Sequence, residues 1–486
     1  MSELRFDLCI LGAGPAGYAA AMRAHDLGRK VLLIERDRIG GAGIHAGALS
    51  SKTMWHLAND DDKARCTTRG YRAEKLRVSY GAVMAEVERA VVERRELLER
   101  QLAHLANPSP GGGQVTLCRG DGRFLSPHCV EVRGGDGTVE RFQADHFLLA
   151  TGSRPRLPKD IPVDGDLVVT SDHIERWDHF PRSLVVIGAG VIGCEYATIF
   201  ANFGATKIYL IDQQPRILPF EDDDVAEVIA GNFEAMGVTI HQGCKLTSLR
   251  LVDGQVEYVV CSDSGVCEPI RVERALVAIG RVPNLEELNL EAAGVLRGPG
   301  GALLGDAPGT TAKHIYAAGD TTTDVALANV AELEGRHAVE QMFGLAPRAI
   351  RFEAISSIMF LKPEVAVVGL NEQQAKRGGI PYRVGLVRNQ LINRNIAMRA
   401  TAGFVKLLAA PDGRLLGARV VGPHASSAVQ GVALLIDRGG TLDDLDHCIH
   451  SHPSVTEGVQ EAARLLLGRS VHKPEVFGGE LLRCDD

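Results

Sequence analysis

The sequence contains no uninterrupted apolar run long enough to cross a bilayer, which excludes a membrane span. It also lacks a long run of basic residues, and its net charge is −8, so nucleic acid is not an expected partner and small molecules are. No basic segment or small-residue cleavage site precedes the first apolar run. We therefore expect a cytoplasmic protein.

No two of the ten cysteines form a CxxC pair, so neither a zinc site nor a disulfide scaffold is supported. We expect most of these cysteines to be reduced and structural. They are Cys9, Cys66, Cys118, Cys129, Cys194, Cys244, Cys261, Cys267, Cys448 and Cys484.

A chain of 486 residues is too long for one hydrophobic core and suggests about three domains. Residues 6–35 read as an apolar strand, a glycine turn, an alanine-rich helix and a second apolar strand, which is a βαβ unit. Residues 183–212 repeat this scheme. The sequence therefore predicts an α/β protein with two Rossmann-type nucleotide-binding domains.

Each unit carries the pattern GxGxxG, in which the glycines permit a tight turn, close approach of a pyrophosphate and tight packing of helix on strand. An acidic residue, Glu35 or Asp212, ends the second strand of each unit, where its carboxylate can accept hydrogen bonds from ribose hydroxyls. The glycines are Gly12, Gly14 and Gly17 in the first unit, and Gly188, Gly190 and Gly193 in the second.

Asp212 favours a free ribose 2′-hydroxyl over a 2′-phosphate, and Gln213 and Gln214 add no positive charge beside it. NADH is therefore the expected nucleotide of the second unit. Arg216 lies close enough in the sequence to keep NADPH as an alternative.

Other segments have simpler patterns. Apolar residues three or four apart between Val83 and Leu105 predict an amphipathic helix, and residues 114–137 alternate like a small antiparallel sheet. From about residue 350, strand-like and helix-like segments without a glycine fingerprint predict an α+β domain. The tail, 469–486, shows no clear period.

Six further segments, together with the two fingerprints, resemble the pyridine nucleotide-disulfide oxidoreductase family, which includes dihydrolipoamide dehydrogenase, mercuric reductase and soluble transhydrogenase. The resemblance covers about residues 5–468. The segments are ATGSRP (150–155), AIGRVPN (278–284), IYAAGD (315–320), PEVAVVG (363–369), GFVKLL (403–408) and HSHPSVTE (450–457).

The resemblance implies an FAD domain, an NAD(P) domain, a central segment that returns to the FAD domain, and a C-terminal α+β domain that forms a homodimer. We place their boundaries at 1–155, 156–280, 281–349 and 350–468, followed by the tail 469–486. The implied cofactors are FAD and NAD(H), with NADP(H) possible.

The resemblance also assigns residues. Asp320 would hydrogen-bond the ribityl chain of FAD, and Lys52, paired with Glu195, would lie near flavin N5, where a cation stabilises the reduced ring. The remaining cofactor-binding positions are Gly41, Thr151, Gly152 and Gly280.

The sequence departs from its relatives where the redox-active disulfide is expected. The disulfide enzymes have Cys-x4-Cys after a Gly-Gly pair, but Gly43 and Ala48 occupy the two cysteine positions here, so the usual thiol relay cannot operate. His45 stands where soluble transhydrogenases also have a histidine, and residues 209–224 look like a transhydrogenase segment.

His452 and Glu457 keep the spacing of the family's His-Glu pair, which reaches the other subunit's flavin. Without thiols to serve, His452 is either a proton donor for another acceptor or a structural residue of the interface. Two single cysteines, Cys448 and Cys484, are candidates to replace the missing pair.

We therefore expect an FAD-dependent NAD(P)H oxidoreductase that passes electrons to a non-disulfide acceptor such as a nicotinamide nucleotide, a quinone or another electron acceptor. The alternatives are a dihydrolipoamide dehydrogenase-like reductase that uses a substitute cysteine, and a redox-inactive FAD-binding dimer with a regulatory role. The intact Lys52, Glu195 and Asp212 count against the last, because a scaffold needs none of them.

Overall fold

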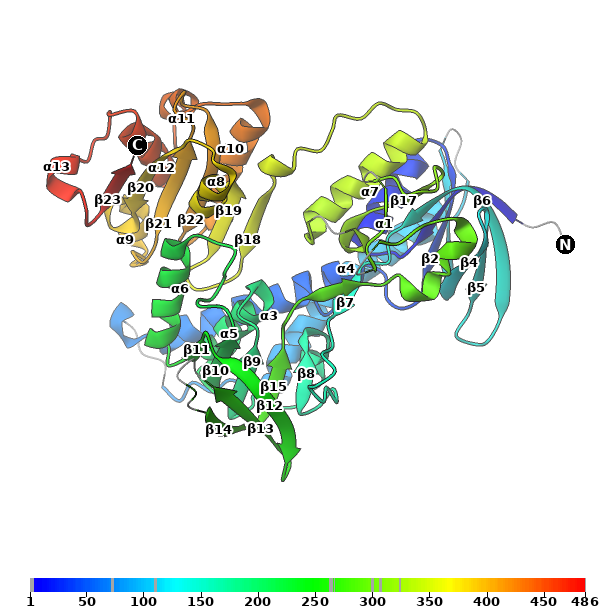
Figure 1. Ribbon diagram of the computed structural model, residues 1–486, viewed down its shortest axis with the longest axis horizontal. Helices are drawn as coiled ribbons and strands as arrows, with labels where there is room; N and C mark the ends of the chain where they lie inside the picture. Colours follow the sequence, from blue (N-terminus) through cyan, green and yellow to red (C-terminus); the bar gives the residue numbers. More distant parts are fainter. Residues whose placement is uncertain are drawn as a thin grey trace.

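A computed structural model describes residues 4–70, 74–108, 112–261, 265, 267–298, 301–305, 308–322 and 325–485. The chain forms three lobes around three main sheets (Figure 1). The first lobe lies at the right of the view, the second at the bottom, and the C-terminal lobe at the upper left. No helix among the described residues is long and apolar enough to span a membrane.

The first lobe is built on a seven-stranded sheet. Its central strands pair in parallel, and residues 8–11 and 31–34 are apolar and buried because both faces of the sheet are covered there. The strands in spatial order are β3 (Gln114–Arg119), β2 (Lys30–Glu35), β1 (Leu4–Leu11), β6 (Val139–Leu149), β5 (Cys129–Arg133) and β4 (Asp121–Ser126), with β17 (Ile315–Ala317) also paired to β6.

This sheet corrects one sequence expectation. Strand β3 does not join a small antiparallel sheet with β4 and β5; it pairs in parallel with β2 and extends the nucleotide-binding sheet. The alternation of its side chains could not reveal this, because an edge strand of either kind has one exposed face. The expectation holds for β4 and β5, which pair antiparallel.

Helices α1 (Pro15–Asp26) and α7 (Ala328–Met342) pack against each other in this lobe. Pro15 occupies the first turn of α1, where its missing N–H costs nothing. A Cβ on Gly335 of α7 would lie 2.2 Å from the carbonyl oxygen of Ala16, so glycine is what allows the two helices to approach this closely. The segment after residue 310 thus returns to the first lobe.

The second lobe contains a parallel five-stranded sheet, a three-stranded antiparallel meander and a two-strand ribbon. Helices α5 (Val191–Phe203) and α6 (Asp223–Ala235) belong to it. The sheet is β11 (Thr239–Gln242), β10 (Lys207–Asp212), β9 (Ser183–Ile187), β15 (Arg274–Val277) and β8 (Val168–Thr170); the meander is β12 (Lys245–Val252), β13 (Gln255–Cys261) and β14 (Cys267–Val272); the ribbon is β7 (Ser153–Pro155) and β16 (Arg281–Pro283).

The C-terminal lobe is a six-stranded antiparallel sheet covered by helices, as expected for an α+β domain. Its strands are β18 (Ser356–Met359), β19 (Val365–Gly369), β22 (Leu415–Val421), β21 (Phe404–Ala409), β20 (Arg383–Arg388) and β23 (Leu482–Asp485). Its helices are α8 (Glu372–Gly378), α9 (Asn393–Ala397), α10 (Ala425–Arg438), α11 (Leu442–His447) and α12 (Glu457–Leu466).

The C-terminal tail is ordered, although its sequence has no period. It forms a short helix, α13 (Pro474–Phe477), and the edge strand β23, which pairs antiparallel with β20. A four-residue edge strand is too short to display a pattern, so its pairing depends on the neighbouring strand rather than on local sequence.

Two long helices, α3 (Ala48–Arg65) and α4 (Tyr80–Leu105), connect the lobes, and the expected amphipathic helix is confirmed as α4. The short helix α2 (Gly41–Ile44) precedes them. Tyr80, Val83 and Val87 of α4 pack in the core of the second lobe, whereas Leu98 and Leu102 pack in that of the first. Because one helix contributes to both cores, the first two lobes are fixed to each other.

The expectation that most of the ten cysteines are reduced is confirmed, although the sequence analysis did not foresee one disulfide. Cys261 and Cys267 are bonded across β13 and β14. The sequence showed six residues of separation but not that the two positions face each other in a hairpin, which is what makes the bond possible. The other eight cysteines take part in no disulfide.

Candidate active site

The first glycine turn joins β1 to α1 and has little space for side chains. Gly12 has a positive φ of 104°, and a Cβ there would lie 2.3 Å from the carbonyl oxygen of Ala150. A Cβ on Gly17 would lie 1.9 Å from the carbonyl oxygen of Gly12. Gly14 caps α1, so the first free N–H groups of the helix face the turn. This is a cradle for the pyrophosphate of a dinucleotide.

Glu35 ends β2 beside this turn and is buried. Its carboxylate accepts hydrogen bonds from the backbone N–H groups of Ala13, at 2.7 Å, and Asp37, at 2.8 Å. The acid is thereby tied to the glycine turn, in the position expected for holding ribose hydroxyls. Gly41 approaches the same turn, since a Cβ there would lie 3.0 Å from the Cα of Gly14.

The second glycine turn repeats this geometry between β9 and α5. A Cβ on Gly188 would lie 2.5 Å from the carbonyl oxygen of Ala278, and one on Gly193 would lie 1.9 Å from that of Gly188, whereas Gly190, which caps α5, faces open space. Asp212 accepts from the N–H groups of Ala189, at 2.7 Å, and Gln214, at 2.8 Å.

Lys52 of α3 and Glu195 of α5 form an ion pair, with Glu195 five residues after Gly190 of the second turn. The Lys52 Nζ lies 2.6 Å from the Glu195 Oε2, and the Glu195 side chain is only 7% exposed. The second carboxylate oxygen accepts from the backbone N–H of Phe360, at 2.9 Å, and the ring of Phe360 lies 5.1 Å from the ammonium. The ion pair with Glu195, the backbone hydrogen bond that fixes this carboxylate, and the ring of Phe360 together hold the Lys52 ammonium in one position.

The segment between the Gly-Gly pair and Lys52 contains no thiol. Gly43 belongs to α2, and a Cβ there would lie 2.7 Å from the Cγ of Pro15, so any larger residue would require the segment to move. Ala48 begins α3. The space that a sulfur would need at position 43 is therefore taken by the start of α1.

His45 lies in the same segment and is buried. Its Nε2 hydrogen-bonds the carbonyl oxygen of Ile39 at 3.0 Å, while its buried Nδ1 has no partner among the described residues. Burial, reinforced by the charge of Arg38, lowers the pKa of His45. The imidazole is therefore neutral at neutral pH.

Asp320 lies in a 3-10 turn after β17 and connects to the second lobe. It accepts from the Ser153 hydroxyl at 2.6 Å, and the Arg281 Nε donates to that hydroxyl at 2.8 Å. Sequence reasoning did not select Ser153 or Arg281, although each belongs to a recognised segment, ATGSRP or AIGRVPN. Thr151 hydrogen-bonds the carbonyl oxygen of Asn284 at 2.7 Å.

The two remaining glycines flank these connections. Gly152 and Gly280 have positive φ values of 63° and 108°, and both face open space, so side chains there would be strained without being crowded.

His452 and Glu457 form a hydrogen-bonded pair in the C-terminal lobe, with 2.7 Å between the Nδ1 and the Oε1. Although burial by itself raises the pKa of Glu457, the bonds from His452 and from the Ser454 N–H hold it below the ordinary value. The His452 side chain is 65% exposed, and no bond joins the pair to Lys52 or Glu195 among the described residues. Within one chain, the pair thus lies apart from the nucleotide turns and faces outward.

Both glycine turns and their acids fit dinucleotides, and comparison with known proteins agrees. The model of the pyridine nucleotide-disulphide oxidoreductase family matches residues 6–335, and that of its dimerisation domain matches residues 355–463. The chain belongs to this family. Members of the family are FAD-dependent and use NAD(H).

Several relatives match over nearly their whole length. A dihydrolipoyl dehydrogenase of Bacillus subtilis is 31% identical over 479 residues, covering 96% of this chain and 99% of that protein. One of Halobacterium salinarum is 32% identical over 478 residues, covering 96% and 97%. LpdA from Mycobacterium tuberculosis has a TM-score of 0.86 at 29% identity, covering 95% of this chain and 99% of that chain.

In the terms of this oxidoreductase family, the first turn fits FAD and the second fits NAD(H). When bound, the flavin would supply hydride and electron transfer, and Glu35 and Asp212 would orient the two riboses. Lys52 pairs with Glu195, which lies in α5 just after the second turn, and the dimerisation domain carries His452 and Glu457.

The free cysteines do not rebuild a dithiol beside the flavin turn. Burial raises the pKa of the Cys9 and Cys194 thiols well above its ordinary value, which makes both unreactive. Cys484 lies in β23, where its backbone pairs with that of Gly385, so the tail that carries it is not a free arm. Cys448 follows α11 and is exposed.

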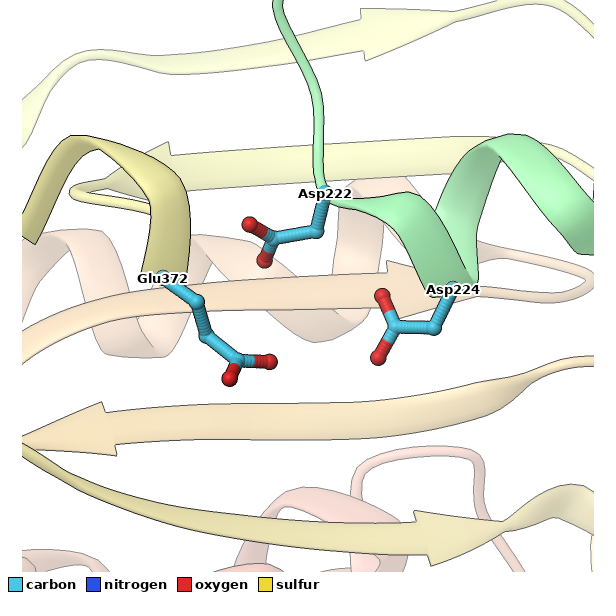
Figure 2. A group of neighbouring side chains, drawn as sticks. All are labelled: Asp222, Asp224 and Glu372. Atoms are coloured by element: carbon cyan, nitrogen blue, oxygen red, sulfur yellow. The ribbon is translucent and has the colours of Figure 1, made fainter. Parts of the chain in front are cut away.

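A cluster of three carboxylates, Asp222, Asp224 and Glu372, has the spacing of a metal site (Figure 2). The ammonium of Lys406, which is fully buried, lies 2.6, 2.7 and 2.9 Å from one oxygen of each carboxylate in that order. The chain therefore supplies the cation itself, and the cluster is a buried ion-pair network between α6, α8 and β21.

Proposed function

We propose that this chain is an FAD-dependent NADH oxidoreductase whose flavin passes electrons to an acceptor other than a disulfide. The observation that carries the proposal is the flavin-side segment, where Gly43 and Ala48 offer no thiol and Pro15 leaves no room for one at position 43. The Lys52–Glu195 pair beside it is intact. The disulfide relay is missing while the residues that assist flavin reduction are present.

The second turn favours NADH over NADPH. Asp212 places a negative charge where a 2′-phosphate would bind, and Arg216 is not free to neutralise it. The guanidinium of Arg216 donates to the carbonyl oxygen of Leu218 at 3.0 Å and pairs with Asp223 at 3.0 Å, on the side of α6. The nearest arginine in sequence is thus occupied elsewhere.

The acceptor would bind on the flavin face that the two sulfurs cover in the disulfide enzymes. Small residues there would leave a surface suited to a planar molecule such as a quinone or a second nicotinamide ring. In a homodimer, His452 of one subunit would reach the flavin site of the other, as the family resemblance implies, and Glu457 would orient its ring to deliver a proton. We further propose that the enzyme acts in the cytoplasm.

An anaerobic stopped-flow experiment tests the proposal. The purified protein should contain FAD, NADH should bleach it at a faster rate than NADPH, and a quinone should reoxidise it. Lipoamide and glutathione disulfide should not be reduced. A colourless protein, or a flavin that NADH does not reduce, would contradict the proposal and favour the redox-inactive dimer.

A reductase with a substitute cysteine is the second candidate, because Cys448 is exposed and four residues before His452. It predicts lipoamide turnover that the variant Cys448→Ser abolishes. Cys66→Ser, which changes a cysteine that is in no disulfide and lies outside the dimerisation domain in sequence, is the matched control. Lipoamide turnover lost in the first variant alone would replace our proposal by this one.

A further inference from the structure

The Cys261–Cys267 disulfide lies at one end of the meander in the second lobe. The two residues are direct partners across β13 and β14 and end the ladder of six residue pairs between these strands. Cys267 is exposed and Cys261 is half-buried, so solvent and thiols can reach the bond. Neither sulfur takes part in the chemistry proposed above.

The same end of the meander is attached to the nucleotide-binding loop. Cys261 pairs on its other side with Lys245, the first residue of β12. Immediately before it, the N–H of Gly243 donates to the carbonyl oxygen of Gln214 at 2.8 Å, and that of Cys244 donates to the carbonyl oxygen of Asp212 at 3.3 Å.

These bonds connect the disulfide to the acid that is expected to hold the NADH ribose. Asp212 and Gln214 are joined to each other, since the Asp212 Oδ1 accepts from the Gln214 N–H. Lys245, Cys261 and Cys267 are thus neighbours across the three strands of the meander. Lys245 follows Gly243 and Cys244, whose bonds reach the residues expected at the adenosine end of the nucleotide site. Figure 1 shows the meander beside β10 and β11 at the bottom of the molecule.

The meander does not need the disulfide in order to fold. Tyr258 is fully buried beneath it, and Glu257 pairs with Arg250 and Arg271 on the neighbouring strands. The bond closes a loop of only six residues of separation, and short loops gain least from a cross-link. Opening the bond would therefore loosen the end of the ladder while the rest remains paired.

We propose that Cys261 and Cys267 form a thiol-exchange site whose oxidation state sets the affinity of the second lobe for NADH. The proposal rests on the nucleotide assignment made above. The closed disulfide restrains Lys245 and, through the bonds of Gly243 and Cys244, the end of β10 at Asp212 and Gln214. The open dithiol releases this restraint, and NADH then binds more weakly.

The exchange needs an external dithiol. Its thiolate attacks one sulfur, the Cys261–Cys267 bond breaks, and a mixed disulfide forms; its second thiol then displaces the remaining cysteine. The protein gains two electrons and two protons as two thiols, and the reductant leaves as a disulfide. A small disulfide oxidant reverses both steps.

The test uses the intact holoenzyme, with dithiothreitol as the reductant and oxidised glutathione as the oxidant. Alkylation and peptide mass measurement report whether the pair is closed, and titration with NADH reports Kd. We expect the reduced protein to bind NADH on the order of fivefold more weakly, with unchanged FAD content. The double variant Cys261→Ser/Cys267→Ser should show the weaker Kd and no response to dithiothreitol, whereas Cys66→Ser should respond like the parent.

An equal Kd for NADH in the open and closed forms, or a pair that stays reduced under the oxidant, would overturn this inference. Either result would leave the proposed function standing as long as NADH still reduces the flavin. If NADH fails to bind in both forms, the nucleotide assignment fails and this inference fails with it.

Discussion

At the scale of single residues, the Lys52–Glu195 pair is the feature on which the proposed chemistry depends most. The carboxylate is nearly buried and receives one hydrogen bond from Phe360 and one ion pair from Lys52. A buried carboxylate with two partners holds the Lys52 ammonium in a fixed position. The ammonium therefore does not have to move when negative charge develops on a neighbouring ring. Placement of the charge, rather than its presence alone, is the useful property.

Replacing Lys52 by Met should therefore slow flavin reduction by NADH roughly 100-fold at saturating NADH, because a positioned charge is lost. Stopped-flow absorbance measures the rate, and the flavin content of the variant shows that FAD still binds. The control is Lys52→Arg, which keeps the charge and should recover part of the rate. An unchanged rate in Lys52→Met would show that the pair only links α3 to α5.

At the scale of single residues, the sequence predicted which residues belong to the candidate site better than it predicted which groups they contact. Glu35 and Asp212 were identified because an acid at the end of a strand has a stated mechanism. Phe360 was missed because an aromatic residue in a β-strand region carries no local signal of the ion pair that it adjoins. The pairing of Cys261 with Cys267 was missed because it depends on strand register.

At the scale of elements, the glycine turns determine how close a helix can lie to its strand. Gly193→Ala would place a Cβ 1.9 Å from the Gly188 carbonyl oxygen, so α5 must move away from β9. We expect this variant to bind NADH at least tenfold more weakly while retaining FAD, which belongs to the other turn. Titration of the flavin-containing protein with NADH measures the effect.

Gly231→Ala is the matched control for this prediction. Gly231 lies within α6 of the same lobe, and a Cβ there meets nothing within 4 Å. Alanine should raise the free energy of unfolding by about 0.5–1 kcal/mol, because glycine is a poor helix former, and should leave NADH binding unchanged. Similar losses of NADH binding in both variants would mean that the close approach at Gly193 is not the cause.

Helices and strands with a clear pattern of apolar residues were predictable from the sequence. Strands whose position depends on a partner strand far away in the sequence were not. The spacing of Val83, Val87 and Val91 predicted α4, and continuous apolar runs predicted β1 and β9. The placement of β3 and β23 depends on β2 and β20, which lie far away in the sequence. Local patterns carry no information about such neighbours.

At the scale of the whole molecule, the buried ion pairs around Lys406 fasten the C-terminal lobe to the second lobe. Asp222 and Asp224 lie at the start of α6 and Glu372 in helix α8 (Figure 2). Lys406 belongs to strand β21 of the C-terminal sheet. A second buried pair, Arg419 with Glu221, crosses the same boundary at 2.9 Å. The nucleotide and dimerisation domains are thus joined by two ion pairs, Lys406–Asp222 and Arg419–Glu221, whose side chains are at most 5% exposed.

Replacing Lys406 by Met should lower the free energy of unfolding by about 3–5 kcal/mol, since it removes the fully buried cation that three carboxylates share and leaves Asp224 and Glu372 with Arg483 alone. Burial alone would lower the pKa of Lys406, but Asp224, Asp222 and Glu372 outweigh it and raise the pKa above the ordinary value. Its contribution is therefore complete at neutral pH and is lost only as the pH rises through that raised pKa. The pKa of Asp222, which burial would raise, is held low by Lys406, so its contribution is lost only in strong acid.

The pH dependence separates this explanation from a simple packing defect. In Lys406→Met, only the charges of Arg483 and Arg419 still oppose the burial of the carboxylates, and the pKa values of these carboxylates should rise above those in the parent and in the unfolded chain. The folded variant then binds protons more readily than the unfolded one, so its deficit in stability should shrink as the pH falls from neutral toward 5. Denaturant titrations at several pH values measure this, with the exposed Lys376→Met as a control that should change stability by less than about 0.5 kcal/mol. A deficit that is constant with pH would point to lost packing around the lysine chain instead of unpaired charge.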